Sequence, residues 1–418
     1  MSEFLQLLPP PQALELFLSH INFTPQTELL ALHYAVKDIT GPITGRVLAQ
    51  GVTAPFALPS FPRSTVDGFA VRAADTHGAS ETLPAYLKMI GEIPMGSTPD
   101  FELGRGECAI IHTGGMVPAG ADAVVMVEYT QVARPGEIEI LRAVSTGTNV
   151  LQPGEDVQTG DEVISAGVRL RPAEIGGLAA IGCTEVEVAV RPKVGIISSG
   201  DEVVAPGEPI SAGQVYDVNS YSLHSLIEQA GGEPVPYGIL SDDAQAFKTT
   251  AERAKSECDL VIFTAGSSVS VRDLTATTIE GLGQPGVLVH GVSVRPGKPT
   301  ILAVADGTPV IGLPGNPVSA LVIARIFVVA TIEKMLGLKT SRPKATVAAR
   351  LSLNLASQAG REDWIGVKLL ETADGYTAEP VFGKSNLIFT LAQADGLMKI
   401  PAAANGIDAG TLILVELL

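Results

Sequence analysis

The stretch from Val310 to Leu321, Val-Ile-Gly-Leu-Pro-Gly-Asn-Pro-Val-Ser-Ala-Leu, predicts a buried strand that is followed at once by a helix. Pro317 suits the first helical turn, because the N–H group that proline lacks would have no intrahelical partner there. Gly315 allows the backbone to come close to a ligand. The start of such a helix directs backbone N–H groups at an anion, but the tetrapeptide from Pro314 to Pro317 is equally compatible with a plain connector.

The sequence around this stretch is typical of an α/β domain. Between residues 191 and 338, short apolar runs alternate with amphipathic segments, which is the pattern of βαβ units around a parallel sheet. The expected strands are residues 194–198, 234–239, 260–264, 287–292 and 309–313, and the expected helices are residues 220–229, 243–256, 274–280 and 318–336.

The rest of the chain divides into three regions of different character. Residues 1–50 and 146–190 are expected to form an N-terminal mixed helical and linker domain, with helices on both sides of Thr24 and Pro25 in the segment 14–37. Residues 51–145 are rich in proline, glycine and short β-like runs, and they predict a β-rich domain. Residues 339–418 alternate in the manner of strands and predict a small all-β domain. The fold class is therefore α/β plus β in a multi-domain subunit.

Composition narrows the function classes. The formal net charge of −17 over 418 residues argues against nucleic acid or a membrane surface as the main partner, because both need clustered basic charge. Cys108, Cys183 and Cys258 have no metal-ligand spacing and fit core positions in a reducing compartment. The chain lacks a leader-like N-terminus and a long apolar run, so we expect a soluble, cytoplasmic protein.

Polar residues follow three of the expected strands. These loops begin at Ser198, Thr264 and Pro314, and the carboxyl ends of parallel strands share one edge of a sheet, where ligands bind in open α/β folds. Backbone N–H groups and hydroxyls in such loops suit phosphate or another oxyanion, and Arg295 and Lys298 add two cations beside the same edge. The sequence therefore predicts a ligand crevice for an anion.

Acidic residues in the same loops predict a divalent cation. Asp201, Glu202 and Asp273 would repel an anion and one another unless Mg²⁺ bridged them. Capping of a helix or turn remains an alternative for Asp201 and Asp273, and a solvated loop carboxylate for Glu202. Asp242 and Asp243 precede a helix, where one of them is expected as the N-cap, and either could reach the crevice.

Several motifs together resemble one family. They are Gly312-Leu-Pro-Gly-Asn-Pro-Val-Ser, Arg295-Pro-Gly-Lys-Pro, Ser199-Gly-Asp-Glu, Tyr216-Asp-Val-Asn, Thr113-Gly-Gly-Met-Val-Pro-Ala-Gly-Ala-Asp-Ala-Val-Val and Ser64-Thr-Val-Asp-Gly-Phe-Ala-Val-Arg. The chain resembles the MoeA family, the molybdopterin molybdenumtransferases related to the gephyrin E domain, in family order over nearly its whole length.

The resemblance implies an activity and an assembly. The reaction is the insertion of molybdate-derived metal into adenylylated molybdopterin, with Mg²⁺-dependent hydrolysis and release of AMP. The implied subunit is elongated, with a MogA-like α/β domain and a C-terminal domain that resembles a small β-barrel. The implied assembly is a homodimer in which the β-rich domain of one subunit completes the active site of the other. A molybdopterin adenylyltransferase is the implied substrate donor.

The resemblance also assigns roles to residues. Glu202, Asp242 and Asp273 match acidic positions for the metal ion and the hydrolytic step, and Lys298 is the matching catalytic cation. Asp67 and Thr113 match the contribution of the partner subunit. The positions expected to bind substrate are Ser199, Gly200, Asp201, Gly266, Ser267, Ser268, Arg295, Pro314, Gly315, Asn316, Pro317 and Ser319.

This chain departs from the family pattern in the loops that would face the anion. Arg63 precedes the Ser-Thr-Val-Asp-Gly segment, Ser267 and Ser270 stand where glycine-rich sequence is usual, Arg295 replaces a usual lysine, and Leu274 replaces an aromatic residue. These changes leave open a preference for tungstate over molybdate. Two further alternatives are an inactive molybdopterin-binding carrier or scaffold and an enzyme that uses the α/β module for another nucleotide hydrolysis.

Overall fold

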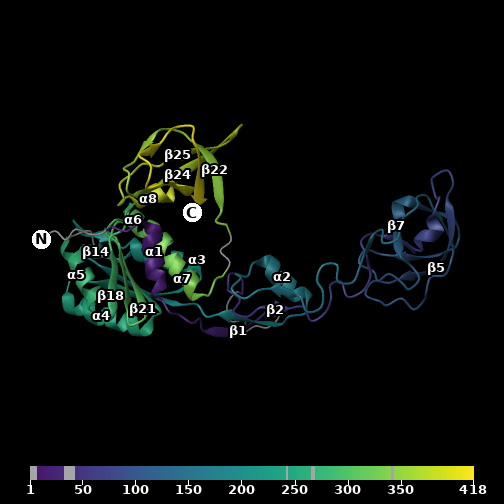
Figure 1. Cartoon of the computed structure of the whole chain (residues 1–418), viewed down its shortest axis with the longest axis horizontal. Helices are drawn as coiled ribbons and strands as arrows, with labels where there is room; N and C mark the ends of the chain where they lie inside the picture. Colours follow the sequence, from purple (N-terminus) through teal and green to yellow (C-terminus); the bar gives the residue numbers. More distant parts are fainter. Residues whose placement is uncertain (1–6, 33–42, 242, 265–268, 340–342) are drawn as a thin grey trace.

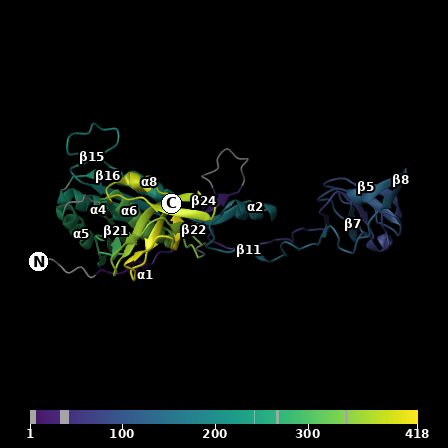
Figure 2. The same ribbon diagram turned by 90° about the horizontal axis from the view of Figure 1, so that it is seen from above.

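The computed structural model describes residues 7–32, 43–241, 243–264, 269–339 and 343–418, and for residues 269–273 only the backbone. Figure 1 shows an elongated molecule with an α/β domain and a C-terminal domain at one end and a β-rich domain at the other. An N-terminal domain lies between them, and Figure 2 shows the same separation from a second direction. The expected multi-domain α/β plus β architecture is confirmed.

The α/β domain is built on a six-stranded sheet in the order β16-β13-β17-β21-β20-β18. The strands are β13 (Lys193–Ser199), β16 (Glu233–Leu240), β17 (Leu260–Thr264), β18 (Pro285–His290), β20 (Ile301–Ala305) and β21 (Thr308–Leu313). β16, β13, β17 and β21 are parallel as predicted, but β20 is antiparallel to both of its neighbours. The five predicted strands all run in the same direction, because β18 and β21 are each antiparallel to β20. β20 was not predicted, and its presence makes the sheet mixed.

Helices cover both faces of this sheet, as expected. They are α3 (Asn219–Ala230), α4 (Ala244–Glu257), α5 (Val269–Glu280), α6 (Pro317–Ile323) and α7 (Val329–Met335), with the π-helical turn η3 (Ala324–Val328) joining the last two. Leu260 and Ile262 of β17 belong to the core under α3, α6 and α7, whereas Val261 and Phe263 pack with α4. Alternate residues of a buried strand thus fill two cores.

Residues 7–32 of the N-terminal region, as far as the structure describes it before residue 43, contain one helix where two were expected. Helix α1 (Pro10–Ser19) is followed by a strand, β1 (Thr27–Ala31), which pairs antiparallel with β12 (Glu185–Ala189). Leu30 is buried and Leu29 is exposed, which is strand alternation, so the prediction of a helix after Thr24 and Pro25 was wrong. The apolar spacing over so short a segment fits either structure.

Two parts of the N-terminal region pack in different places. Phe17 of α1 is buried in the core of the α/β domain, which differs from the assignment of residues 1–50 as one block. Leu30 instead packs with α2 (Pro172–Ala180) and β12, in a small core that also holds Leu48 and Ile164. The chain therefore returns after residue 146 to complete a domain that it began before residue 50.

A two-stranded stalk connects this domain to the β-rich domain. Strand β2 (Val52–Thr53) pairs with β11 (Glu162–Ile164), and β3 (Arg63–Ser64) pairs with β10 (Val150–Leu151). The β-rich domain beyond it has a sheet in the order β7-β4-β6-β5-β9-β8. Its elements are β4 (Gly68–Val71), η1 (Ala73–Thr76), β5 (Ala85–Ile93), β6 (Glu107–Ile111), β7 (Ala123–Met126), η2 (Val127–Tyr129), β8 (Thr130–Arg134) and β9 (Glu137–Ile140).

The C-terminal domain is a small barrel. Its strands run in the order β24-β25-β22-β28-β26, and pairing of β24 with β26 closes the ring. The elements are β22 (Thr346–Leu351), β23 (Leu355–Ala356), β24 (Glu362–Thr372), β25 (Gly375–Pro380), α8 (Ile388–Ala392), β26 (Gly396–Ile400), β27 (Gly406–Ile407) and β28 (Leu412–Leu417). Closure removes exposed strand edges, and the apolar interior includes Val367, Met398 and Val415.

Candidate functional site

The carboxyl ends of the parallel strands lie side by side at one edge of the α/β sheet, as predicted. Ser198 lies beside Thr264, and Thr264 lies beside Leu313, in the parallel registers of β13, β17 and β21. His290 at the end of β18 faces Ile301, which faces Gly312, so the segment after β18 leaves from the same edge. The loops after four strands therefore emerge together.

The loop between β18 and β20 is tied to the C-terminal barrel. Its short strand β19 (Val294–Arg295) pairs parallel with β24, with Arg295 opposite Asp363. Asp363 is only 4% exposed, and its carboxylate lies 2.9 Å from Arg361 Nε and 3.7 Å from Arg295 Nη1. One buried acid thus orients two guanidinium groups from two domains.

Gly297 brings the same loop close to α6. Its φ of +116° is unfavourable for other residues, and a Cβ atom there would lie 2.3 Å from Ile323 Cγ1. The Thr300 hydroxyl donates a 2.6 Å hydrogen bond to the Gly297 carbonyl. A larger residue at position 297 would therefore push the loop that carries Arg295 and Lys298 away from α6.

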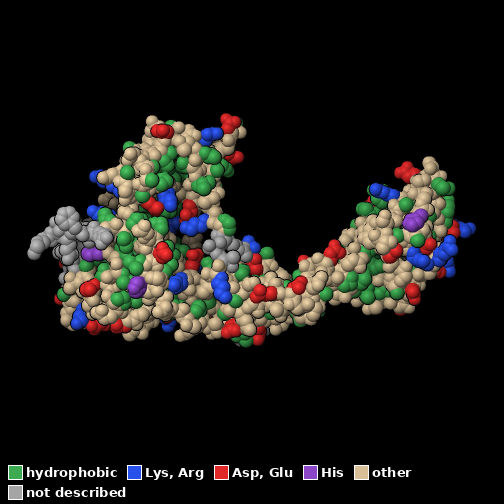
Figure 3. All heavy atoms as spheres, in the orientation of Figure 1, with side chains coloured by type: hydrophobic (Ala, Val, Ile, Leu, Met, Phe, Trp, Pro, Cys, Tyr) green, Lys and Arg blue, Asp and Glu red, His purple; other side chains and the backbone are tan. Residues whose placement is uncertain are grey.

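A cleft of about 1320 Å³ lies between this loop and the barrel. Figure 3 shows charged side chains of both signs where the C-terminal domain meets the α/β domain. Among the residues that the structure describes, the charged ones that line the cleft are four cations, Arg295, Lys298, Arg361 and Lys384, and one acid, Asp363. Asp363 pairs with two of these cations. The one acid does not balance the four cations, so the lining carries an excess of positive charge, although the chain as a whole has a net charge of −17. Such a surface suits an oxyanion.

The start of α6 contributes to the cleft in a different way from that expected. Pro314, Asn316 and Ser319 line the cleft. However, the N–H group of Val318 donates to the Ser385 carbonyl at 3.0 Å, and Asn316 Nδ2 donates to Ser385 Oγ at 3.0 Å. The first helical turn is therefore partly occupied by the C-terminal domain, so it is not a fully open anion site.

Asn219 joins two of the strand ends, a role that the sequence analysis did not assign. Its Nδ2 group donates to Thr264 Oγ1 at 2.6 Å and to the Gly315 carbonyl at 2.9 Å. Asn219 is buried at the start of α3. The quoted motif Tyr216-Asp-Val-Asn219 carried this signal, since a buried amide at a helix start commonly fixes backbone nearby.

The loop after β13 lies at the same edge but does not reach the cleft. Ser199 is buried at the end of the strand, and Gly200, Asp201 and Glu202 form the turn that follows. Within the described ranges, none of these four residues lines the cleft between the domains. The structure therefore separates them from Arg295 and Lys298.

Several predicted site residues fall outside what the structure describes. Asp242, Gly266, Ser267 and Ser268 lie outside the described residues, and Asp273 is placed only as backbone in α5. Asp243 caps α4 by accepting a 2.7 Å hydrogen bond from the Ala246 N–H group. Across the described residues, no group of three or more His, Cys, Asp or Glu side chains is arranged to hold a metal ion.

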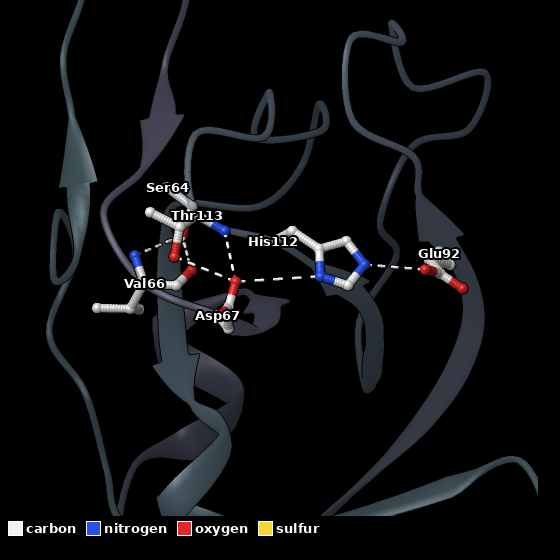
Figure 4. A network of polar contacts seen from close by, with 6 residues as sticks. All are labelled: Ser64, Val66, Asp67, Glu92, His112 and Thr113. Atoms are coloured by element: carbon white, nitrogen blue, oxygen red, sulfur yellow. Dashed lines mark hydrogen bonds and ion pairs between the residues drawn. The ribbon is translucent and has the colours of Figure 1, made fainter.

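Asp67, just before β4, and Thr113, just after β6, meet in the β-rich domain (Figure 4). Figure 1 shows this domain at the opposite end of the molecule from the α/β and C-terminal domains. Asp67 Oδ1 accepts hydrogen bonds from the Thr113 N–H group at 2.7 Å and from the Thr113 hydroxyl at 3.1 Å. These two bonds hold the pKa of Asp67 below its ordinary value. His112 lies between the carboxylates, with Nε2 2.9 Å from Glu92 and Nδ1 4.0 Å from Asp67.

The cysteines occupy structural positions, as expected. Cys108 and Cys258 are buried, and Cys183 is half-buried. Burial raises the pKa of Cys108 to about 12, which keeps it a neutral thiol at physiological pH. No helix in the described part of the chain is long and apolar enough to span a membrane.

The contribution of the C-terminal domain to the cleft was missed from the sequence. Arg361, Asp363, Lys384 and Ser385 all come from that domain. The available signal was the segment Gly383-Lys-Ser-Asn, a cation and hydroxyl next to glycine in a loop. It could not be placed without knowing how the barrel docks on the sheet edge.

The fold and the cleft define a class of protein, and three family models match the chain in order. They are "MoeA N-terminal region (domain I and II)" over residues 8–182, "Probable molybdopterin binding domain" over 195–334 and "MoeA C-terminal region (domain IV)" over 348–418. The chain belongs to the MoeA family.

Relatives of this chain align with it over nearly the full length of both sequences. A molybdopterin molybdenumtransferase of Nostoc is 35% identical over 89% of this chain and 86% of its own, and that of Haemophilus influenzae is 31% identical over 98% of both. A crystal structure of a molybdopterin biosynthesis MoeA protein from Pyrococcus horikoshii is 33% identical, covers 99% of this chain and 100% of its own, and superposes with a TM-score of 0.84.

Proposed function

We propose that this chain is a molybdopterin molybdenumtransferase, which inserts molybdate-derived metal into adenylylated molybdopterin and releases AMP. The observation that carries the proposal is the cationic cleft between the α/β and C-terminal domains, with Asp363 orienting Arg295 and Arg361. Molybdate and the phosphates of the nucleotide are all oxyanions. Membership of a family whose relatives bear this enzyme name adds support.

The cleft residues would act by electrostatics and positioning. The planar guanidinium groups of Arg295 and Arg361 can each bind two oxygens of an anion, whereas Lys298 provides a point charge. Charge that develops during attack on a phosphoanhydride is stabilised best by donors that are already in place. Asp363 holds one side of both arginines, and this leaves their other N–H groups for the ligand.

Mg²⁺ remains a prediction. Glu202, Asp242 and Asp273 would hold it, and the cation would neutralise charge on the phosphates. Glu202 is half-buried in the turn after β13, but the side chains of the other two are not described. The described residues alone do not form an acidic cluster that fits the ion, so no step is assigned to it.

The homodimer is likewise proposed. Asp67 and Thr113 are exposed and belong to the β-rich domain, which Figure 1 shows at the opposite end of the molecule from the two domains that form the cleft. A second copy, arranged antiparallel to the first about a two-fold axis, would bring the β-rich domain of one subunit to the cleft of the other. We propose that Asp67 and Thr113 serve the partner's cleft.

The proposal extends to the setting of the reaction. Adenylylated molybdopterin must come from an adenylyl-transfer enzyme, and we propose a molybdopterin adenylyltransferase as the donor. The three free thiols are compatible with a reducing, cytoplasmic compartment.

The test is AMP release by the purified protein with adenylyl-molybdopterin, Mg²⁺ and either molybdate or tungstate. We expect release above a heat-inactivated control, and the ratio of the two rates gives the oxyanion preference. Molybdopterin binding without AMP release at any Mg²⁺ concentration would instead identify an inactive carrier. Removal of Mg²⁺ by EDTA, with Mg²⁺ added back as the control, tests the metal requirement.

A further inference from the structure

Phe382 is a large aromatic side chain that stands exposed inside the cleft. It lies between β25 and α8, lines the cleft and is 66% exposed. An exposed phenylalanine in a concave polar site leaves an apolar ring face available to a ligand.

The backbone around Phe382 is held on both sides. The Val381 N–H group donates to the Gly366 carbonyl of β24 at 2.8 Å, and Ser385 bonds to Asn316 and Val318 of the α/β domain. Between them, Gly383 packs so closely on α8 that a Cβ atom would lie 2.2 Å from Thr390 Cγ2. The ring is thus carried by a segment with little freedom to lose on binding.

Cations line the same cleft as this ring. Lys384 is two residues away and lines the same cleft, as do Arg361, Arg295 and Lys298. A cleft that holds both an aromatic face and several cations has the combination that binds a planar heterocycle attached to a phosphate. The cleft volume of about 1320 Å³ also exceeds the roughly 300–1,000 Å³ typical of sites for drug-sized ligands, so a substrate with two ring systems has room.

We propose that Phe382 stacks on a heteroaromatic ring of the phosphate-bearing substrate while the cleft cations hold its phosphate. The proposal rests on the proposed function, because the adenylylated substrate carries two such rings, an adenine and a pterin. Phe382 is then a substrate-binding residue that selects for the ring.

The experiment compares ligands with and without a ring by isothermal titration calorimetry on the full chain. AMP and ribose 5-phosphate differ by adenine, and 6-hydroxymethylpterin phosphate tests the pterin. The variants are Phe382→Ala and Phe382→Tyr, and the control is Phe389→Ala, since Phe389 is 74% exposed but is not among the cleft-lining residues. Quenching of Trp364, the single tryptophan of the chain, which lines the cleft, gives a second readout for AMP.

We expect Phe382→Ala to raise the Kd of one ring-bearing ligand by about 5- to 100-fold, the range of a lost base–aromatic stack. Ribose 5-phosphate should be unaffected, and both Phe382→Tyr and Phe389→Ala should bind like the wild type. The ligand that responds identifies the ring. Equal affinities of wild type and Phe382→Ala for both ring-bearing ligands, or an equal loss for ribose 5-phosphate, would overturn the inference. Wild-type AMP release tests the proposed function separately, because that reaction could proceed without the stack.

Discussion

The cleft and the Asp67 cluster are both polar, but the chain holds them in different ways. The cleft is formed by two domains of one subunit, which are joined by the pairing of β19 with β24 and by the bonds from Ser385 to α6. The Asp67 cluster lies at the end of a stalk, and the Asp67 side chain is 65% exposed. A site made of both regions therefore has one half that is fixed within the subunit and one half that depends on assembly.

Substitutions in the cleft, the half of the site that is fixed within the subunit, are expected to have the largest effect on AMP release. Lys298→Ala should lower the rate of AMP release by about 100-fold or more, which is the usual loss when a donor to a developing oxyanion is removed. Steady-state AMP release is the measurement. Lys248→Ala is the matched control, because Lys248 is an exposed lysine on α4 outside the cleft. Equal losses in both variants would contradict a specific role.

Complementation between two inactive variants tests whether the Asp67 cluster acts in the cleft of the partner subunit. Asp67→Ala and Lys298→Ala chains should each be nearly inactive alone. After co-refolding or co-expression, the mixture as a whole should recover about a quarter of wild-type activity, because about half of the dimers are then mixed and each mixed dimer contains one intact site out of two.

The control for this experiment is a mixture of two Lys298→Ala preparations with different tags, which should stay inactive. If the Asp67→Ala and Lys298→Ala mixture shows no recovery although mixed dimers form, Asp67 does not act in the partner's site.

The ion pairs of Asp363 should matter for both stability and substrate binding. Asp363→Asn removes the charge that holds Arg295 and Arg361, and we expect it to lower the free energy of unfolding by about 1–3 kcal/mol. KM should rise more than kcat falls, because the guanidinium groups lose their orientation. Chemical denaturation and steady-state kinetics measure the two effects, and Asp374→Asn in the exposed turn after β24 should change neither.

The smallest expected effect is a change in the pKa of Asp67, in the exposed Asp67 cluster. The pKa of Asp67 is lowered mainly by the Thr113 N–H group and then by the Thr113 hydroxyl. Thr113→Val removes only the hydroxyl, so the pKa should rise part of the way to its ordinary value. Because the folded-state pKa is depressed, the favourable contribution is present above the unfolded pKa and is lost as pH falls through the folded one. NMR titration of the Asp67 carboxyl measures the shift, and an unchanged pKa would contradict the hydrogen bond.

The sequence predicted the elements of this molecule better than the contacts between them. Periodicity located β13, β17 and β21 and the helices between them, since a buried strand and an amphipathic helix have local signatures. It missed β20 (Ile301–Ala305), although the five residues of that strand are all buried, as are those of β17. It also misread β1, because the partner of that strand, β12, lies more than 150 residues away.

The same limit applies to the candidate site. Arg295, Lys298, Asn316 and Ser319 were predicted from the strand ends to which they are attached, and the cleft contains all four. The C-terminal barrel carries the other charged residues of the cleft, Arg361, Asp363 and Lys384. Their position relative to the sheet edge depends on the docking of β24 against β19. No local pattern encodes that docking, because it arises from packing between domains. The roles of Glu202, Asp242 and Asp273 stay predictions.

The stalk has a consequence for how this chain can change over evolution. Thr65 and Asn149, on its two passes, are joined by a 3.0 Å hydrogen bond, so the β-rich domain leaves and rejoins the molecule at a single point. A domain whose ends are adjacent can be exchanged as a cassette without disturbing its host, much as domain insertions are tolerated. The end of the molecule that we assign to the partner's cleft could thus diverge, and alter partner choice, while the cleft itself stayed the same.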